Sequence, residues 1–351
     1  MVVIIAATFW GLLSGCNSRR GMSGEVFTLE DARTIQVEPF RVLDQTELGR
    51  PGAIICWDED RVIVADRPLP SLLSLINVNT GEKRPFLKMG RGPGECLGAS
   101  NLTEQNGKLY LHSIASKKMI VLQESKDTDS VFSLVEDIPV ETECIRIIPT
   151  RQAGYIGTVR MGGRFVLFSA DGSVVDTLGT FPNVEGEEEA INNTALQSML
   201  AFSPDGKYFC SAFTSMDFVE IYTNNFKTLK RLWGPEQTIP RVMRIESGGF
   251  IHNIHEPHKQ VYGTISTSDQ GFLVGYVGHL YKDRDDPSRC TKELFYFDWD
   301  GHFLARYLLP EEVAFFDVDW KNARMYGVTA GVEAKLVVAQ LEGLNELSFK
   351  R

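Results

Sequence analysis

The hydrophobic positions of this chain fall in short runs that polar turns separate. From about residue 31 onward, runs of β-branched and aromatic residues alternate with clusters of Gly, Asn, Asp and Pro. This pattern is typical of strands joined by tight turns. Long helical periodicity is missing, and only Glu185 to Leu200 is compatible with a short helix or a structured loop. The pattern therefore predicts an all-β protein.

Two kinds of unit repeat along the chain. The first is a hairpin of two strands around a polar turn, predicted at residues 75–83, 119–132, 165–175, 220–227, 294–303 and 336–349. The second is a turn and an apolar strand that precede each hairpin, at residues 61–66, 107–112, 154–159, 206–213, 271–276 and 323–328. Successive copies begin some 45 to 65 residues apart, which is within reach of the period of a four-stranded propeller blade with its loops.

The repeats predict a six-bladed β-propeller of four-stranded antiparallel blades. A single blade cannot bury both faces of its sheet, so several must pack radially around one axis. The last blade then needs a strand from elsewhere, and residues near Arg33 to Val42 are expected to complete the sheet that the C-terminus begins. Two stacked β-sandwich domains are the alternative, because strand patterning alone does not distinguish closure from sandwiching.

The first residues have the pattern of a secretory leader. An apolar run from Val2 to Leu13 is too short to span a bilayer as a helix, and it ends in Leu13-Ser14-Gly15-Cys16, which has the form of a bacterial lipobox. We expect cleavage before Cys16 and lipidation of that cysteine, since several acyl chains together give stable anchoring. No Lys or Arg precedes the run, so the translation start is expected further upstream.

These features divide the chain into three parts. Residues 1–15 are predicted to be the signal peptide, 16–31 the lipidated cysteine with a flexible polar tether, and 32–351 the propeller domain. No second segment is long and apolar enough for a transmembrane helix.

Charge and cysteine content narrow the class of function. The chain has 36 basic and 46 acidic residues, with no clustered Lys/Arg stripe, so nucleic acid is not an expected partner. Besides Cys16, the cysteines show no CxxC spacing and are odd in number: Cys56, Cys96, Cys144, Cys210 and Cys290. They indicate neither a zinc site nor a disulfide framework, and most are expected to be small buried hydrophobes.

One segment resembles a known family. Val62 to Asp66, a hairpin, and then Gly90-Arg91-Gly92-Pro93-Gly94-Glu95 resemble the first blade of the TolB-like six-bladed β-propeller lipoproteins of Bacteroidetes, which are NHL-like in shape. In that family an aromatic residue usually follows the G-x-G-P-G-E motif, whereas Cys96 stands here. The resemblance implies a propeller fold and an anchored location in the cell envelope, but no activity.

The residues after the lipobox bear on location. Surface-exported lipoproteins of this group tend to have acidic residues directly after the lipidated cysteine, whereas this chain has Asn17-Ser18-Arg19-Arg20. The resemblance therefore favours an outer-membrane lipoprotein that faces the periplasm. The protein is expected to be a monomer.

The strongest local motif gives three candidate ligand-binding residues. A loop that links one blade to the next is expected to pass near the mouth of the central channel, where Arg91 and Glu95 could meet a ligand together with Asp66. The alternative is local: Glu95 accepts backbone N–H bonds, and Arg91 pairs with a neighbouring acid. The motif is not a phosphate-binding loop, because its Lys-Ser/Thr end is missing.

Metal binding and catalysis have weaker support. His252, His255 and His258 form the only histidine cluster, and only a loop could bring all three around a metal ion. Solvated or hydrogen-bonded histidines are the preferred interpretation, so neither a metal nor a cofactor is predicted. No Gly-x-Ser-x-Gly elbow is present, and no Ser, His and Asp spacing indicates a catalytic triad.

Two functional hypotheses follow. The first is a non-enzymatic binding or scaffolding lipoprotein whose propeller holds a protein, peptide or glycan. The second is a hydrolase or lyase that acts on sugars or lactones in the central channel. The second hypothesis requires at least three His, Asp, Glu or Asn side chains to converge in that channel around an ion.

Overall fold

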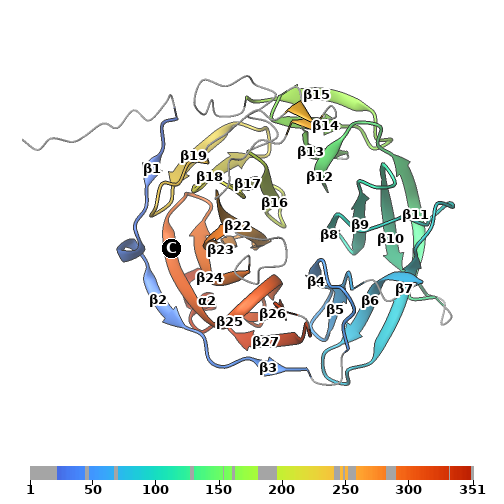
Figure 1. Cartoon of the computed structure of the whole chain (residues 1–351), viewed down its shortest axis with the longest axis horizontal. Coiled ribbons are helices and arrows are strands. Elements are labelled where there is room, and N and C mark those ends of the chain that lie inside the picture. The colour runs from blue at the N-terminus through green and yellow to red at the C-terminus, as the bar shows by residue number, and fades with distance from the viewer. Residues whose placement is uncertain are drawn as a thin grey trace, which may run out of the picture.

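A computed structural model places short antiparallel sheets around a single axis (Figure 1). The structure describes residues 22–43, 47–66, 70–126, 130–152, 154–159, 163–180, 196–240, 246–247, 250–251, 258–281, 290–331 and 333–348. The sheets follow one another around the ring in chain order, and the first strand of each lies nearest the centre. This is the arrangement of a β-propeller.

The first three blades are regular four-stranded sheets. Blade one contains β4 (Ile54–Cys56), β5 (Arg61–Val64), β6 (Ser71–Asn77) and β7 (Lys83–Lys88). Blade two contains β8 (Asn101–Gln105), β9 (Lys108–Ser113), β10 (Lys118–Glu124) and β11 (Phe132–Pro139). Blade three contains β12 (Cys144–Pro149), β13 (Tyr155–Val159), β14 (Phe165–Phe168) and β15 (Val174–Leu178).

The other three blades include strands from the N-terminal segment. Blade four contains β16 (Ser198–Phe202), β17 (Tyr208–Phe213), β18 (Phe218–Thr223) and β19 (Thr228–Trp233), and β1 (Glu25–Val26) adds in parallel to β19. Blade five contains β22 (His258–Thr267), β23 (Gly271–Tyr281), β24 (Thr291–Asp298) and the first half of β25 (Phe303–Asp319), to which β2 (Arg33–Gln36) adds in parallel. Blade six contains the second half of β25, β26 (Arg324–Thr329), β27 (Leu336–Gln340) and β3 (Arg41–Val42).

The long strand β25 connects two blades. Its first half pairs with β24 as the outer strand of blade five, and from Val313 onward it pairs with β26 as the innermost strand of blade six. Three short elements lie outside the blades: the hairpin β20 (Glu246–Ser247) and β21 (Phe250–Ile251), the 3-10 helix η1 (Leu29–Asp31) and the helix α2 (Leu344–Ser348). Within the described ranges, no helix has the length and apolar character needed to cross a bilayer.

The polar turns of the sequence form the hairpins. Between β6 and β7, the Asn77 side chain accepts hydrogen bonds from the backbone N–H groups of Asn79 (3.0 Å) and Thr80 (2.9 Å). Gly81 then takes a positive φ of 73°, which a side chain would disfavour. Such a turn sets the register of the two strands that it joins.

The ring is closed by the N-terminal segment. Strand β3 pairs antiparallel with β27, with Val42 opposite Val337, and the N–H of Leu43 donates to the carbonyl of Leu336 at 2.9 Å. Leu43 is 9% exposed and packs in one cluster with residues of blade one and blade six. The predicted completion of the last sheet is confirmed, and the alternative of two sandwiches is excluded.

Some sequence-based boundaries differ from the structure. The predicted hairpin at 336–349 is the single strand β27 followed by α2, because the fourth strand of that blade comes from the N-terminal segment. Residues from Glu25 onward contact the propeller, so the domain begins before the predicted boundary at residue 32. Of the stretch from Glu185 to Leu200, residues 185–195 lie outside the described ranges, and residues 198–200 belong to β16.

Truncation of Leu43 tests the closure. Leu43→Ala leaves a cavity between the first and last blades, which is expected to lower the free energy of unfolding by about 2–3 kcal/mol. Val175→Ala is the matched control, because Val175 is 66% exposed on the outer strand of blade three. Urea denaturation monitored by tryptophan fluorescence measures the free energy of unfolding of both variants. Equal stability of the two variants would contradict a closure that depends on this contact.

Candidate functional site

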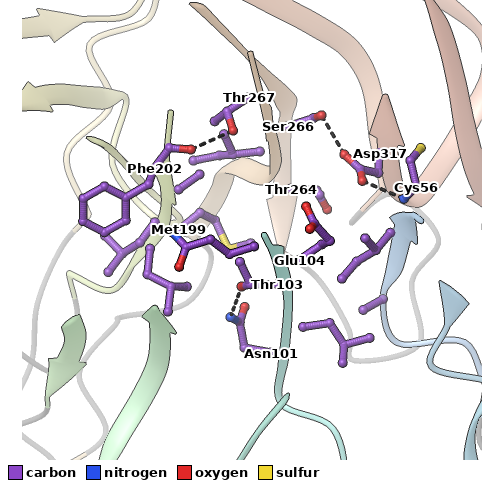
Figure 2. Close-up of a pocket in the computed structure, with 18 of the residues that line it drawn as sticks. Cys56, Asn101, Thr103, Glu104, Met199, Phe202, Thr264, Ser266, Thr267 and Asp317 are labelled. Carbon is purple, nitrogen blue, oxygen red and sulfur yellow. Dashed lines mark hydrogen bonds between the residues drawn. The ribbon is translucent and has the colours of Figure 1, made fainter. Parts of the chain in front are cut away.

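The axis of the propeller contains a cavity to which every blade contributes. Its volume is about 510 Å³, and its walls come from β4, β8, β12, β16, β22 and the second half of β25. Each blade has four antiparallel strands, so all six innermost strands run in the same direction along the axis. The cavity therefore has an entry end, where these strands start, and an exit end, where they finish. Figure 2 shows the side chains that surround it.

A hydrogen-bonded group centred on Asp317 lies toward the exit end. The Asp317 carboxylate accepts hydrogen bonds from the N–H of Cys56 (2.8 Å), the hydroxyl of Ser266 (2.6 Å) and its neighbour's backbone N–H (2.9 Å). The indole N–H of Trp320 donates to the same Ser266 hydroxyl at 3.0 Å. Strands of blades one, five and six thus meet at this group (Figure 2).

Burial dominates the electrostatics of this group. It raises the pKa of the Asp317 carboxyl, although the three donors act in the opposite direction. Burial and the neighbouring Asp317 charge also raise the pKa of the Cys56 thiol well above its ordinary value. Cys56 is therefore a protonated thiol at neutral pH and is not an activated nucleophile.

Strand β8 contributes the second polar group of the cavity. The Asn101 amide donates to the carbonyl of Ile147 on blade three (3.1 Å) and to the hydroxyl of Thr103 (3.3 Å). Glu104 follows on the same strand, and its carboxylate accepts the backbone N–H of Gly107 at 2.8 Å. The charge of Glu104 contributes to the raised pKa of Asp317. Two carboxylates therefore share the cavity (Figure 2).

Arg146 supplies a positive charge toward the entry end. It is the third residue of β12, and it lines the cavity. Burial lowers the pKa of its guanidinium to about 10, so the side chain stays charged at neutral pH. On blade two, His112 is 2% exposed, and burial together with the Arg146 charge lowers the pKa of its imidazole to about 4.

Asp66 lies inside blade one, away from the cavity lining. Its side chain is fully buried, accepts the hydroxyl of Ser74 at 3.0 Å and forms an ion pair with Lys83 at 2.5 Å. These contacts join the end of β5 to the hairpin of β6 and β7.

The loop from Gly90 to Glu95 packs against blade two. The Glu95 carboxylate accepts the N–H of Gly92 at 3.0 Å and pairs with Lys88 at 3.2 Å, and these contacts lower its pKa. A Cβ at position 90 would collide with this carboxylate, which explains the glycine there. The N–H of Gly94 donates to Asp137 on the outer strand β11 at 2.8 Å. Glu95 thus makes the local contacts of the alternative interpretation.

Arg91 is exposed on the same loop. Arg91, Glu95 and Asp66 are not brought together around the cavity, since none of the three lines it. Ligand binding by these residues stays a prediction.

The predicted histidine cluster is only partly described. His252 and His255 lie outside the described residues, and His258 begins β22. In the ranges that the structure describes, the one group with metal-binding spacing is Asp298, Asp300 and His302. It forms the turn between β24 and β25, where His302 hydrogen-bonds to Asp298 at 2.8 Å. None of these three residues lines the cavity, and the turn carries no metal-site assignment.

The described cysteines lie in the propeller, and most of them are buried. The structure contains no disulfide among its described residues, and four of the cysteines are buried: Cys96, Cys144, Cys210 and Cys290. The expectation of small buried hydrophobes is confirmed for these four.

Sequence reasoning missed the residues that do line the cavity. Asn101, Arg146 and Asp317 come from three blades, and no local motif marks any of them. The one available signal was Asn101-Leu102-Thr103-Glu104-Gln105, a strand with four polar side chains directly before a predicted apolar strand. Such polarity is expected of an innermost strand that borders a channel.

The fold and the cavity define a closed β-propeller with a polar central channel. The chain belongs to the TolB-like six-bladed propeller family, because the family described as TolB-like 6-blade propeller-like matches residues 73–321. None of the curated proteins matches the sequence.

Solved structures agree on the fold. A protein of Bacteroides fragilis NCTC 9343, named as a candidate exported protein, is 11% identical, with a TM-score of 0.51 over 90% of this chain and 93% of that chain. The WD40 domain of Pan2 from Neurospora crassa is also 11% identical, with a TM-score of 0.50 over 83% of this chain and 89% of that chain. At such identities the likeness concerns the fold alone.

The buried His112 predicts a pH-dependent stability. Its pKa is about 4 in the folded protein against an ordinary value of 6.5, so between these values only the unfolded chain binds the proton. The stabilising contribution is complete above pH 6.5 and is lost as the pH falls toward 4. Between pH 7 and 4.5 the folded protein should lose about 2–3 kcal/mol that a His112→Gln variant does not lose.

Urea denaturation at the two pH values measures this difference. His279→Gln is the control, because His279 is exposed on β23. A His112→Gln variant with the same pH dependence as the unchanged protein would show that this imidazole is not buried in its neutral form.

Proposed function

We propose that this protein is an envelope-anchored lipoprotein whose propeller binds a ligand in its central channel without converting it. The observation that carries the proposal is the cavity of about 510 Å³ to which the innermost strands of all six blades contribute. Its size lies within the usual range for small-molecule sites, which is about 300–1,000 Å³. A peptide end or one or two sugar units would fit such a volume.

The chemistry of the lining supports a polar ligand. Asn101, Thr103 and Ser266 offer hydrogen-bonding groups, and Trp320 offers a half-buried aromatic surface beside them. Polar groups fixed by their neighbours select the orientation of a ligand, whereas apolar walls supply most of the affinity. The closed ring holds these groups in place, so little ordering is needed when the ligand binds.

The proposed anchorage rests on the sequence. Leu13-Ser14-Gly15-Cys16 is the expected lipidation signal, and Asn17-Ser18-Arg19-Arg20 favours retention at the outer membrane on the periplasmic side. The likeness in fold to a Bacteroides fragilis protein named as a candidate exported protein is in keeping with this location. A propeller held there could also act as a scaffold for a protein partner.

The second candidate function is a hydrolase or lyase of sugars or lactones. The observation that favours it is the presence of Glu104 and Asp317 in one cavity, together with Asn101 and Asn106. Glycoside cleavage uses two carboxyl groups of which one is protonated, and the raised pKa of Asp317 suits the protonated role. Turnover separates this candidate from pure binding.

Ligand binding is tested with a panel of small molecules and with a variant whose cavity is filled by a larger side chain. A panel of neutral monosaccharides, disaccharides and tripeptides is added to the purified protein, and the melting temperature is measured. A panel member at about 100 times its dissociation constant should raise the melting temperature by about 5 °C or more. Thr103→Trp places an indole in the cavity and should abolish that shift, whereas Val175→Ala on the outer strand should retain it.

The same mixtures are then assayed for new reducing ends, and a separate set of lactones is assayed for ring opening. Binding without turnover supports the binding module, and turnover that Glu104→Gln abolishes supports the enzyme. A thermal shift that persists in the folded Thr103→Trp variant would place the ligand outside the channel and contradict the proposal.

Replacement of Cys16 tests the anchor. In a bacterial host that processes lipoproteins, the protein with its leader should partition with the membrane fraction, and Cys16→Ser should release it to the periplasmic fraction. Cys56→Ser is the control, because Cys56 lies in the propeller. Mass spectrometry of the first mature peptide should show acyl chains. An intact leader without them would disprove the anchor.

A further inference from the structure

Two arginines lie close to the interface between blades three and four, and their surroundings differ. Arg164 is 2% exposed and forms an ion pair with Glu220. It also donates to the hydroxyl groups of Tyr222 (2.9 Å) and Ser211 (2.8 Å). Its charge is therefore compensated within the fold, as a structural arginine requires.

Arg146 has no such compensation. Within the described ranges its guanidinium forms neither an ion pair nor a hydrogen bond, although its Nε atom is buried. Unlike Arg164, it borders the central cavity. Arg146 is half-buried. A half-buried charge without a counter-charge is incompletely solvated, so an anion bound in the cavity would stabilise it.

Two unpaired hydroxyl groups belong to the same region. Thr158 lies directly opposite Arg146 in the pairing of β12 with β13, so both side chains are on one face of blade three. Ile148 is on the same face of β12 and packs against Leu200 of blade four. Ser198 lies two residues before Leu200 on β16, so its side chain is on the side of β16 that faces blade three. Thr158 and Ser198 are each 1% exposed, and neither hydroxyl has a hydrogen-bond partner in the part of the chain described.

We propose that Arg146 forms an oxyanion site in the wall of the central channel, which binds the carboxylate or phosphate group of a small acidic ligand. The guanidinium offers a planar set of N–H donors that matches such a group. The buried hydroxyl groups of Thr158 and Ser198 lie on the same interface between blades three and four. Thr158 and Ser198 do not line the cavity, so direct contact with the anion is assigned to Arg146 alone. The inference rests on the proposed ligand-binding function and specifies the chemical class of its ligand.

The other charges of the cavity are consistent with this position. Glu104 and Asp317 lie near the ends of β8 and β25, and Arg151, which also lines the cavity, follows the end of β12. Arg146 is the third residue of β12 and lies nearer the start of that strand. Because all the innermost strands run in one direction, the two carboxylates and Arg151 are toward the exit end of the channel, and Arg146 is nearer the entry end. An acidic ligand would therefore place its anionic group at the entry end, away from the carboxylates.

Titration calorimetry with three probes tests the site. The probes are D-galacturonate, which has a carboxylate, D-galactose, which is neutral, and inorganic phosphate. The unchanged protein should bind galacturonate, phosphate or both at least about tenfold more tightly than galactose, and Arg146→Gln should remove that preference. Arg146→Lys keeps the charge but loses the planar donors, so it should retain part of the preference. Arg33→Gln on the outer strand β2 is the matched control and should bind within about twofold of the unchanged protein.

A second measurement needs no variant. The Arg146 charge contributes to the lowered pKa of His112, so an anion bound at Arg146 should raise that pKa. NMR titration of the His112 ring with and without the anionic probe follows this change, and galactose should leave the pKa where it was.

The outcomes separate the two proposals. No preference for either anion, or a preference that a folded Arg146→Gln variant retains, overturns the oxyanion site. The proposed function survives that result if a neutral ligand still binds and Thr103→Trp abolishes its binding. Preference for galacturonate alone assigns a carboxylate ligand, and preference for phosphate alone assigns a phosphorylated ligand.

Discussion

The whole molecule depends on one constraint: each blade has two apolar faces, and only its neighbours can bury them. Blades two to five each lie between the preceding and the following blade of the chain. The first and last blades must pack against each other to bury their remaining faces. The pairing of β3 with β27 brings this about, and Leu43 then packs among Val62, Tyr326 and Val338 of these two blades. Because closure comes from the N-terminal segment, the last blade is incomplete until both ends of the chain are present. The other contacts of the ring rely on this one pairing.

Closure also creates the channel. When the faces of the sheets are buried between blades, the innermost strands are left around the axis, where their edges and part of their side chains border open space. Each blade contributes a few residues, such as Asn101 from blade two, Arg146 from blade three and Asp317 from blade six. A site built this way belongs to no single blade. The backbone positions of these residues are as fixed as the packed sheets that contain them.

The fold could be predicted from the sequence, but the residues that line the cavity could not. Hairpin turns such as that of Asn77 and Gly81 are local, so their residues are sufficient to predict strands, and six such units imply a ring. The N-terminal closing strand followed from the need to complete the last blade. In contrast, Arg146 and Asp317 are separated by 171 positions and come together only in the closed ring. The motif at Gly90 to Glu95 is conspicuous in the sequence but does not line the cavity. Its local contacts account for the glycine at position 90 and for Glu95.

The N-terminal segment links closure to the proposed anchorage. It runs along the outer edges of blades four, five and six as β1, β2 and β3, so the chain leaves the propeller at its rim (Figure 1). Nine steps of chain separate Cys16 from Glu25, and a fully extended chain of that length spans about 30 Å. A lipid on Cys16 would therefore hold the rim near blade four close to the bilayer. An attachment at the rim, and not at either end of the axis, would keep the bilayer from covering the cavity.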